Sequence, residues 1–259
     1  MGRAVIIGGA GIGDYAGIRE ILREDDYFIF CDGGLRHSEG LGVRPSLIVG
    51  DFDSHAMPER REDPDFDTEE PAAYGQKVVH TRTADGCEMI VLPHMKDWTD
   101  TAYAAGEVIR RGFREALLIG ASGGRPDHYL GNISILLMLE QRGIEAWMRD
   151  DISEMRVLIG CILPETEGGS GEPPYGKWRG ADGAGRGNRV EISDSCRYFS
   201  LLAYDGPAKG VRIRNALYPL DDAVITAEEP YAVSNEVLPG QRAEVSVTEG
   251  KLLVIVITK

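Results

Sequence analysis

Ser46-Leu47-Ile48-Val49-Gly50-Asp51-Phe52-Asp53-Ser54 is the stretch of sequence on which the fold of this chain depends. Its apolar run of Leu, Ile and Val is typical of a strand buried within a parallel sheet. The run ends at Gly50, where two carboxylates and a hydroxyl follow. If the backbone stays extended there, Asp51 and Asp53 project to the same side.

Two carboxylates on one side of a strand end repel each other, and a cation between them removes that repulsion. The spacing of Asp51 and Asp53 offers oxygen ligands to a hard ion such as Mg²⁺. The alternative interpretation is an ordinary polar turn, because Gly, Asp and Ser are common turn residues. This stretch alone leaves both interpretations open.

On both sides of this stretch, apolar runs alternate with helical patterns. We expect strands at 4–7, 27–31, 47–49, 78–79, 116–119 and 145–148, and helices at 14–23, 35–41, 99–111 and 128–141. Residues 55–76 are polar and predict a loop or an irregular helix. The alternation of strands and helices predicts a parallel sheet with crossover connections.

After Asp150 the pattern changes to short β-like runs separated by turn residues. These runs lie at 155–162, 189–192, 198–203, 210–213, 231–232, 243–247 and 252–258, with a Gly- and Pro-rich loop at 165–188. Such a pattern predicts an all-β sandwich or barrel. The predicted fold is therefore an N-terminal parallel-sheet α/β domain, residues 1–150, followed by a C-terminal all-β sandwich domain, residues 151–259.

Composition narrows the class of protein. The chain has 259 residues and a formal net charge of −14, which disfavours nucleic acid and anionic membranes as partners. The first apolar run is too short for a signal peptide, and no run reaches transmembrane length. The cysteines, Cys31, Cys87, Cys161 and Cys196, lie far apart and are expected to be reduced thiols. We expect a cytoplasmic protein.

A second candidate cluster, Lys96-Asp97-Trp98-Thr99-Asp100, precedes an amphipathic helical pattern. Thr99 could cap that helix, and acidic residues at a helix start are often only caps. Beside Asp51 and Asp53, however, Asp100 becomes a candidate third metal ligand. Lys96 then offers a positive charge to a phosphate.

A third candidate cluster, Gly120-Ala121-Ser122-Gly123-Gly124-Arg125-Pro126-Asp127-His128, follows a predicted strand. Its glycines allow a close approach of the backbone to a ligand. Arg125 suits phosphate oxygens, and Asp127 could position a hydroxyl or a metal-bound water. The alternative is an ordinary turn. Because ligands of open parallel sheets bind outside the carboxyl ends of the strands, we expect these clusters to converge on one edge.

A competing interpretation starts from Gly11-Ile12-Gly13-Asp14-Tyr15-Ala16, which fits a dinucleotide-binding fingerprint after a strand. Asp32, near the end of the next strand, would bind the ribose. On this interpretation the protein is a nicotinamide-dependent oxidoreductase.

Taken together, the motifs resemble those of the thiamine pyrophosphokinase family. The matching stretches, in the order in which the family has them, are Asp32-Gly33-Gly34, Gly50 to Ser54, Lys96 to Asp100, Gly124 to His128, and Ser234-Asn235-Glu236. The resemblance implies transfer of a pyrophosphoryl group from ATP to the hydroxyl of thiamine, with release of AMP. It also implies Mg²⁺ and a homodimer with composite active sites. A non-catalytic nucleotide- or thiamine-binding module with the same fold is a further alternative.

The resemblance gives each candidate residue a role. Asp51, Asp53 and Asp100 would hold Mg²⁺, while Lys96, Thr99 and Arg125 would bind ATP. Asp127 would orient the thiamine hydroxyl, with Asp32 as the alternative. Ser234 and Asn235 of the C-terminal domain would contact thiamine across the dimer interface. The N-terminal domain would then bind the nucleotide and catalyse the transfer.

Overall fold

A computed structural model of the protein describes residues 2–160 and 188–258. Cys161, the end of the predicted strand 155–162 and nearly all of the predicted loop 165–188 lie outside these residues. The fold is mixed α/β, with one large sheet and a separate four-stranded sheet. The chain divides into two compact units, Met1–Ile135 with Arg149–Asp151, and Leu136–Met148 with Ile152–Lys259. The domain boundary at residue 150 stays a prediction.

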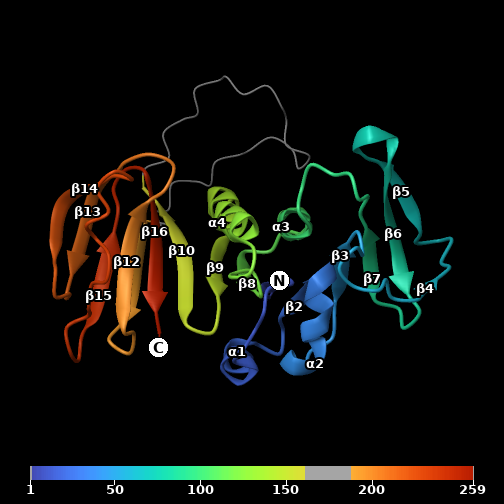
Figure 1. Ribbon diagram of the computed structural model, residues 1–259, viewed down its shortest axis with the longest axis horizontal. Helices are drawn as coiled ribbons and strands as arrows, with labels where there is room; N and C mark the ends of the chain where they lie inside the picture. The colour runs from blue at the N-terminus through green and yellow to red at the C-terminus, as the bar shows by residue number, and fades with distance from the viewer. Residues whose placement is uncertain (1, 161–187, 259) are drawn as a thin grey trace. The chain divides into compact units, whose positions relative to one another are not determined.

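The first unit is built around five parallel strands in the order β8-β1-β2-β3-β7 (Figure 1). Their bounds are β1 Ala4–Ile7, β2 Tyr27–Cys31, β3 Leu47–Gly50, β7 Glu88–Val91 and β8 Glu115–Ile119. Strand β1 is fully buried along its length, as its unbroken apolar sequence predicts. The predicted parallel sheet with crossovers is therefore present.

Helices cover both faces of these strands. They are α1 Tyr15–Ile21, η1 Asp32–His37, α2 Ser38–Leu41 and α3 Asp100–Arg110, while α4 Pro126–Gln141 begins in this unit. Helix α3 packs on β1, β2 and β3 through small buried residues that include Ala104 and Ala105. Figure 1 shows α1 and α2 on the other side of these strands. Right-handed crossovers require this, because the chain crosses the sheet in opposite directions through α1 and through α3.

An antiparallel extension continues the sheet beyond β7. It consists of β4 Arg60–Arg61, β5 Thr68–Pro71, η2 Ala73–Gly75 and β6 Lys77–Thr83, and β6 pairs with β4, β5 and β7. The expectation of a loop or an irregular helix over 55–76 is wrong for β4 and β5 and holds for the rest of that segment, and β7 was not predicted. Strand β5 is exposed along its length and contains no apolar pattern, so its pairing with β6 defines it.

The second unit contains four strands of the large sheet, in the order β12-β16-β10-β9, and the separate four-stranded sheet, in the order β11-β15-β13-β14. The bounds are β9 Glu145–Arg149, β10 Ser153–Ile159, β11 Arg189–Ser193, β12 Tyr198–Ala203, β13 Ala208–Arg214, β14 Leu220–Ile225, β15 Arg242–Ser246 and β16 Lys251–Ile257. Side chains from both sheets form one buried cluster that includes Phe199, Val211, Val245 and Val254. This is the sandwich packing that the alternation predicts.

Two sequence expectations fail in this unit. Residues 231–232 form no strand, since Pro230 offers no amide and Ala232 accepts a single backbone hydrogen bond, from Leu201 N at 2.8 Å. Strand β14 was missed because two exposed aspartates and shifts in its register with β13 interrupt the pattern.

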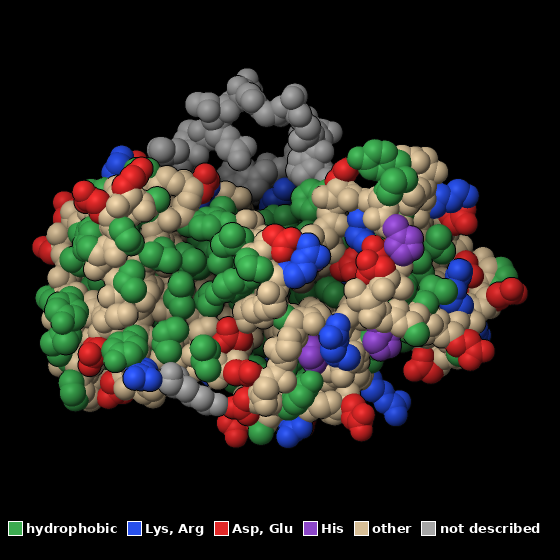
Figure 2. All heavy atoms as spheres, viewed as in Figure 1, with side chains coloured by type: hydrophobic (Ala, Val, Ile, Leu, Met, Phe, Trp, Pro, Cys, Tyr) green, Lys and Arg blue, Asp and Glu red, His purple; other side chains and the backbone are tan. Residues whose placement is uncertain are grey.

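No helix among the described residues is long and apolar enough to cross a membrane. Basic and acidic side chains are interspersed on the face in Figure 2.

Candidate functional site

The site begins where β2 and β3 end side by side. Cys31 pairs with Val49 in the parallel register, so Asp32 and Gly50 follow at the same edge of the sheet. A side chain at Gly50 would place its Cβ 2.6 Å from the Cβ of Asp32. Only glycine lets the two strand ends approach this closely, and the chain has glycine there.

Three carboxylates gather at this edge. Asp32, Asp51 and Asp53 each place an oxygen within 4.8 Å of the other two. The carboxylates of Asp51 and Asp53 do not meet through an extended backbone, as the sequence led us to expect. Instead, Phe52 has φ +58°, and the chain turns directly after β3. A phenylalanine in the left-handed region is uncommon and stores strain, which is found most often at functional sites.

Asp32 is the buried member of the group. Only 1% of its surface is exposed, and one carboxylate oxygen accepts from Ser54 N at 2.9 Å. The other, Oδ1, has no hydrogen-bond partner in the described part of the chain. Burial raises the pKa of Asp32 against the effect of the Ser54 amide, and the charges of Asp53 and Asp51 raise it further. The hydroxyl of Ser54 donates to Asp53 at 2.7 Å and lowers the pKa of that exposed carboxyl.

Lys96 connects this group to helix α3. Its ammonium contacts the carboxylate of Asp51 and lies 3.0 Å from Oδ1 of Asp100, the first residue of the helix. Burial lowers the pKa of Lys96, but the two carboxylates outweigh burial and raise it. Burial likewise raises the pKa of Asp100 against the effect of Lys96. Thr99 caps the helix as predicted, accepting from Ala102 N at 3.2 Å.

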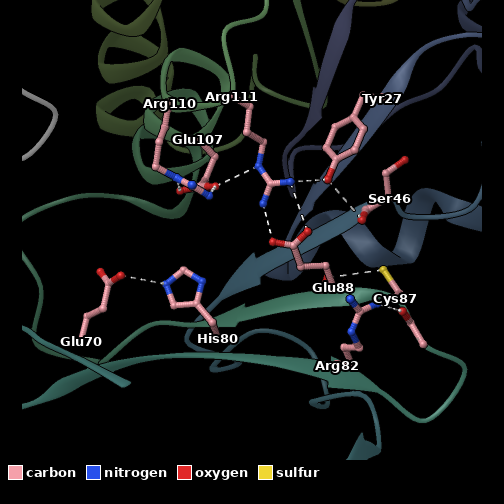
Figure 3. Close-up of polar contacts among 11 residues, drawn as sticks. Tyr27, Ser46, Glu70, His80, Arg82, Cys87, Glu88, Glu107, Arg110 and Arg111 are labelled. Atoms are coloured by element: carbon pink, nitrogen blue, oxygen red, sulfur yellow. Dashed lines mark hydrogen bonds and ion pairs between the residues drawn. The ribbon is translucent and has the colours of Figure 1, made fainter. Parts of the chain in front are cut away.

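The far end of α3 is fixed by a network of charges (Figure 3). Arg111 donates to the carboxylate of Glu88 on β7 and, at 2.8 Å, to the hydroxyl of Tyr27 on β2. Glu107, which is 2% exposed, accepts from Arg110 and Arg111. Burial alone would raise the pKa of Glu107, and the two guanidinium groups lower it. The network therefore ties the end of α3, the helix that begins at Asp100, to β7 and to β2, the strand that leads into Asp32.

Two glycine-containing loops lie at the same edge of the sheet. Gly8 N donates to Ile119 O and Ala10 N donates to Gly120 O, both at 2.8 Å. These bonds join the loop after β1 to the loop after β8. The convergence of polar loops at the carboxyl ends of the strands, which the sequence predicts, is therefore present for β1, β2, β3 and β8.

Two backbone amides of the loop after β1 are already bound by a side chain of this protein. Gly13 N and Asp14 N donate to the carboxylate of Asp151, at 2.8 and 3.0 Å. Asp32, the predicted ribose ligand, is buried and directed at Ser54. Both observations oppose the oxidoreductase interpretation. The pyrophosphate of a bound dinucleotide would need the amides of the loop, and its ribose would need the carboxylate of Asp32.

Arg125 and Asp127 pair with each other on the surface. Arg125 Nη2 lies 2.5 Å from Asp127 Oδ2, and both side chains are mostly exposed. The bond from Arg125 lowers the pKa of Asp127 to about 2. Among the described residues, no hydrogen bond or ion pair joins Arg125 or Asp127 to Asp32, Asp51 or Asp53. Arg125 and Asp127 therefore remain predicted site residues.

Ser234 and Asn235 lie in the second unit. Asn235 is 4% exposed, and its side chain donates to Tyr218 O at 2.8 Å and accepts from Tyr218 N at 3.0 Å. Ser234 is exposed, with φ +61°. The amide of Asn235 thus holds the turn that presents Ser234.

Two residues close to the site, His94 and Asp151, carry little signal in the sequence. His94 Nδ1 lies 3.7 Å from Asp51 Oδ2, and only its position two residues before Lys96 could have drawn attention to it. Asp151, far along the chain, fixes the loop after β1 and carries no local signal.

Comparison with known proteins agrees with this arrangement. Residues 18–148 match the family described as "Thiamin pyrophosphokinase, catalytic domain", and residues 188–252 match "Thiamin pyrophosphokinase, vitamin B1 binding domain". The chain belongs to the thiamin pyrophosphokinase family. The first match contains Asp32, Asp51, Asp53 and Asp100, and the second contains Ser234 and Asn235.

Individual relatives are similar along nearly the whole chain. A thiamine pyrophosphokinase of Bacillus subtilis (strain 168) is 24% identical over 232 residues, which are 90% of this chain and 87% of that protein. The crystal structure of a B. subtilis thiamine pyrophosphokinase has a TM-score of 0.70 at 20% identity and full coverage of both chains. A Geobacillus thermodenitrificans structure has a TM-score of 0.67 at 21% identity, covering 100% of this chain and 98% of its own. At these identities the two structures establish the fold.

Proposed function

We propose that this protein transfers a pyrophosphoryl group from ATP to the hydroxyl of thiamine, giving thiamine diphosphate and AMP. The observation that carries the proposal is the group of Asp32, Asp51 and Asp53 at the carboxyl ends of β2 and β3, inside the segment that matches the catalytic family. The family matches support nucleotide binding by residues 1–150 and thiamine binding by residues 151–259.

The donor set fits Mg²⁺. Carboxylate oxygens are ligands that Mg²⁺ prefers, and the buried Asp32 Oδ1, unpartnered among the described residues, is an acceptor that a cation would satisfy. Asp51 and Asp53 would hold the ion, with the predicted Asp100 or the nearer Asp32 completing the set. When bound, Mg²⁺ supplies charge neutralisation for the phosphate oxygens.

The chain's own residues then bind and orient the substrates. Lys96 holds its ammonium between two carboxylates, where it can contact an incoming phosphate, and Arg125 offers a guanidinium on a loop after β8. The thiamine hydroxyl attacks the β-phosphorus of ATP, and AMP leaves in line. If Asp100 completes the metal set, Asp32 is the better proton acceptor of the two carboxylates considered for that hydroxyl, because its pKa is raised. Asp127, with a pKa of about 2, is left with a hydrogen-bonding role.

The test is incubation of the full chain with ATP, MgCl₂ and thiamine, followed by mass spectrometry and ³¹P NMR. We expect AMP and thiamine diphosphate in equal amounts, and neither product with the Asp51→Asn variant. An unchanged mixture from the unmodified protein would refute the proposal and favour a non-catalytic binding module. Tight binding of NADH would instead favour the oxidoreductase.

We further propose a homodimer with composite sites, in which Ser234 and Asn235 of one subunit face the carboxylates of the other. Short neutral side chains suit an aminopyrimidine ring. Ser234, exposed on a turn that Asn235 holds, is such a side chain. Mixing Asp51→Asn with Asn235→Ala under subunit exchange should restore part of the activity, since each heterodimer has one intact site. If exchange is demonstrated and both parents are folded but inactive, no recovery would place the site within one chain.

A further inference from the structure

A separate pocket lies on the four-stranded sheet of the second unit. It has a volume of about 150 Å³ and is lined by Arg189, Arg212, Arg214, Glu244 and Ser246. These residues come from β11, β13 and β15, and their buried neighbours, among them Ile213, Ala243 and Val245, face the sandwich core. Because strand residues alternate between faces, the pocket lies on the outer face of the sheet.

The strand register explains why three arginines meet there. Ser246 on the central strand β15 pairs with Arg189 on one side and with Arg212 on the other. Glu244, two residues away on the same face, pairs with Arg214. Residues paired in this way have Cβ atoms roughly 5 Å apart. Two guanidinium groups therefore flank one hydroxyl, and a third lies in the next row.

The arginines are only partly neutralised. Arg189 lies 2.9 Å from Glu244 and 3.9 Å from Glu191, and Arg212 lies 3.0 Å from Asp221, whose side chain is 89% exposed. Exposed pairs of this kind contribute little and exchange readily for a stronger anion. Among the ion pairs between described residues, Arg214 takes part in none. Such a concentration of guanidinium groups stands out in a chain with a net charge of −14.

We propose that this pocket is a binding site for a small phosphate-bearing anion, held by Arg189, Arg212 and Arg214 with the hydroxyl of Ser246. Guanidinium groups bind phosphate oxygens in a bidentate manner, and a hydroxyl adds a donor. The pocket is smaller than the roughly 300 Å³ or more of typical ligand sites, which favours a phosphate or diphosphate group over an entire nucleotide. The site shares no residue with the carboxylate cluster, so its failure would leave the proposed function intact.

The experiment measures binding of inorganic phosphate and of inorganic pyrophosphate to the full chain by isothermal titration calorimetry, at low salt with EDTA. Arg214→Gln removes a charge without leaving a carboxylate that it paired, and should weaken binding about tenfold. Glu244→Gln removes the anion that lines the pocket and should tighten binding. Arg242→Gln is the matched control, since Arg242 lies on the same strand and face as Ser246 but outside the pocket. It should bind as the unmodified protein does.

Binding of AMP, measured in the same way, distinguishes a site for the phosphate of a nucleotide from a site for free inorganic anions. If AMP binds with the same dependence on Arg214, the pocket accepts the phosphate of a nucleotide, and if only the inorganic ions do so, it is selective for free anions. Absence of binding by both inorganic ions would overturn the proposal. Equal weakening by Arg214→Gln and Arg242→Gln would also overturn it, because the effect would then be one of general charge.

Discussion

Replacing Gly50 by alanine should damage the site and the fold together. The new Cβ would lie 2.6 Å from the Cβ of Asp32 and 3.1 Å from its Cα and N. Because carbon atoms in contact lie about 3.5–4 Å apart, Asp32 or the end of β3 must move by about 1 Å. Overpacking of this kind costs about 1–3 kcal/mol in the free energy of unfolding. A displacement of about 1 Å in a reacting group costs up to about a hundredfold in turnover.

Two measurements test Gly50→Ala. Denaturant unfolding gives its free energy of unfolding, and a separate assay gives its rate of AMP release at saturating ATP, Mg²⁺ and thiamine. Gly11→Ala is the control, because nothing lies within 4 Å of a Cβ added at Gly11. This control should change stability by less than about 0.5 kcal/mol. If Gly50→Ala were as stable and as active as the unmodified protein, the packing of Asp32 against β3 would not position the carboxylate.

Three other predictions follow from the carboxylates and the cations. Asp51→Asn and Asp53→Asn should each abolish AMP release, and near-normal turnover at saturating Mg²⁺ would contradict the metal assignment. Asp53→Asn should also leave the melting temperature of the metal-free protein unchanged or higher, since it removes a mutually repelling charge, whereas Asp51→Asn also removes the partner of Lys96. Arg125→Ala should raise the Michaelis constant for ATP more than that for thiamine, and unchanged constants would make Arg125 only a turn residue. Burial raises the pKa of Glu140 from 4.5 to about 7. The folded state then binds the extra proton, so stability should fall as pH rises from about 4.5 to 7. Glu140→Gln should remove this dependence and add about 3 kcal/mol at pH 8, measured by urea unfolding; an unchanged pH profile would mean that Glu140 titrates normally.

The parts of the fold that sequence predicts are those that a local pattern specifies. Residues 27–31 and 198–203 form strands with the predicted bounds, because their apolar side chains must be buried whatever surrounds them. Strand β5 has no such requirement, and only pairing with β6 makes it a strand. The same holds for the arginine pocket, whose residues look unrelated until the register of three strands places them in adjacent rows.

The residues of the candidate site likewise fall into those that a local sequence pattern predicts and those that only the fold brings together. Asp51, Asp53 and Lys96 were found because each lies where a strand ends or a helix begins, and the parallel sheet brings such positions to one edge. Which carboxylates meet there depends on two local features without a sequence signal. Phe52 adopts a left-handed conformation, and Gly50 leaves room for Asp32 beside β3. Together they bring Asp32 into the group of three, whereas Asp100 reaches Asp51 only through the ammonium of Lys96. That ammonium offsets part of the repulsion within the cluster before any substrate binds, so an acidic protein can hold these carboxylates close together.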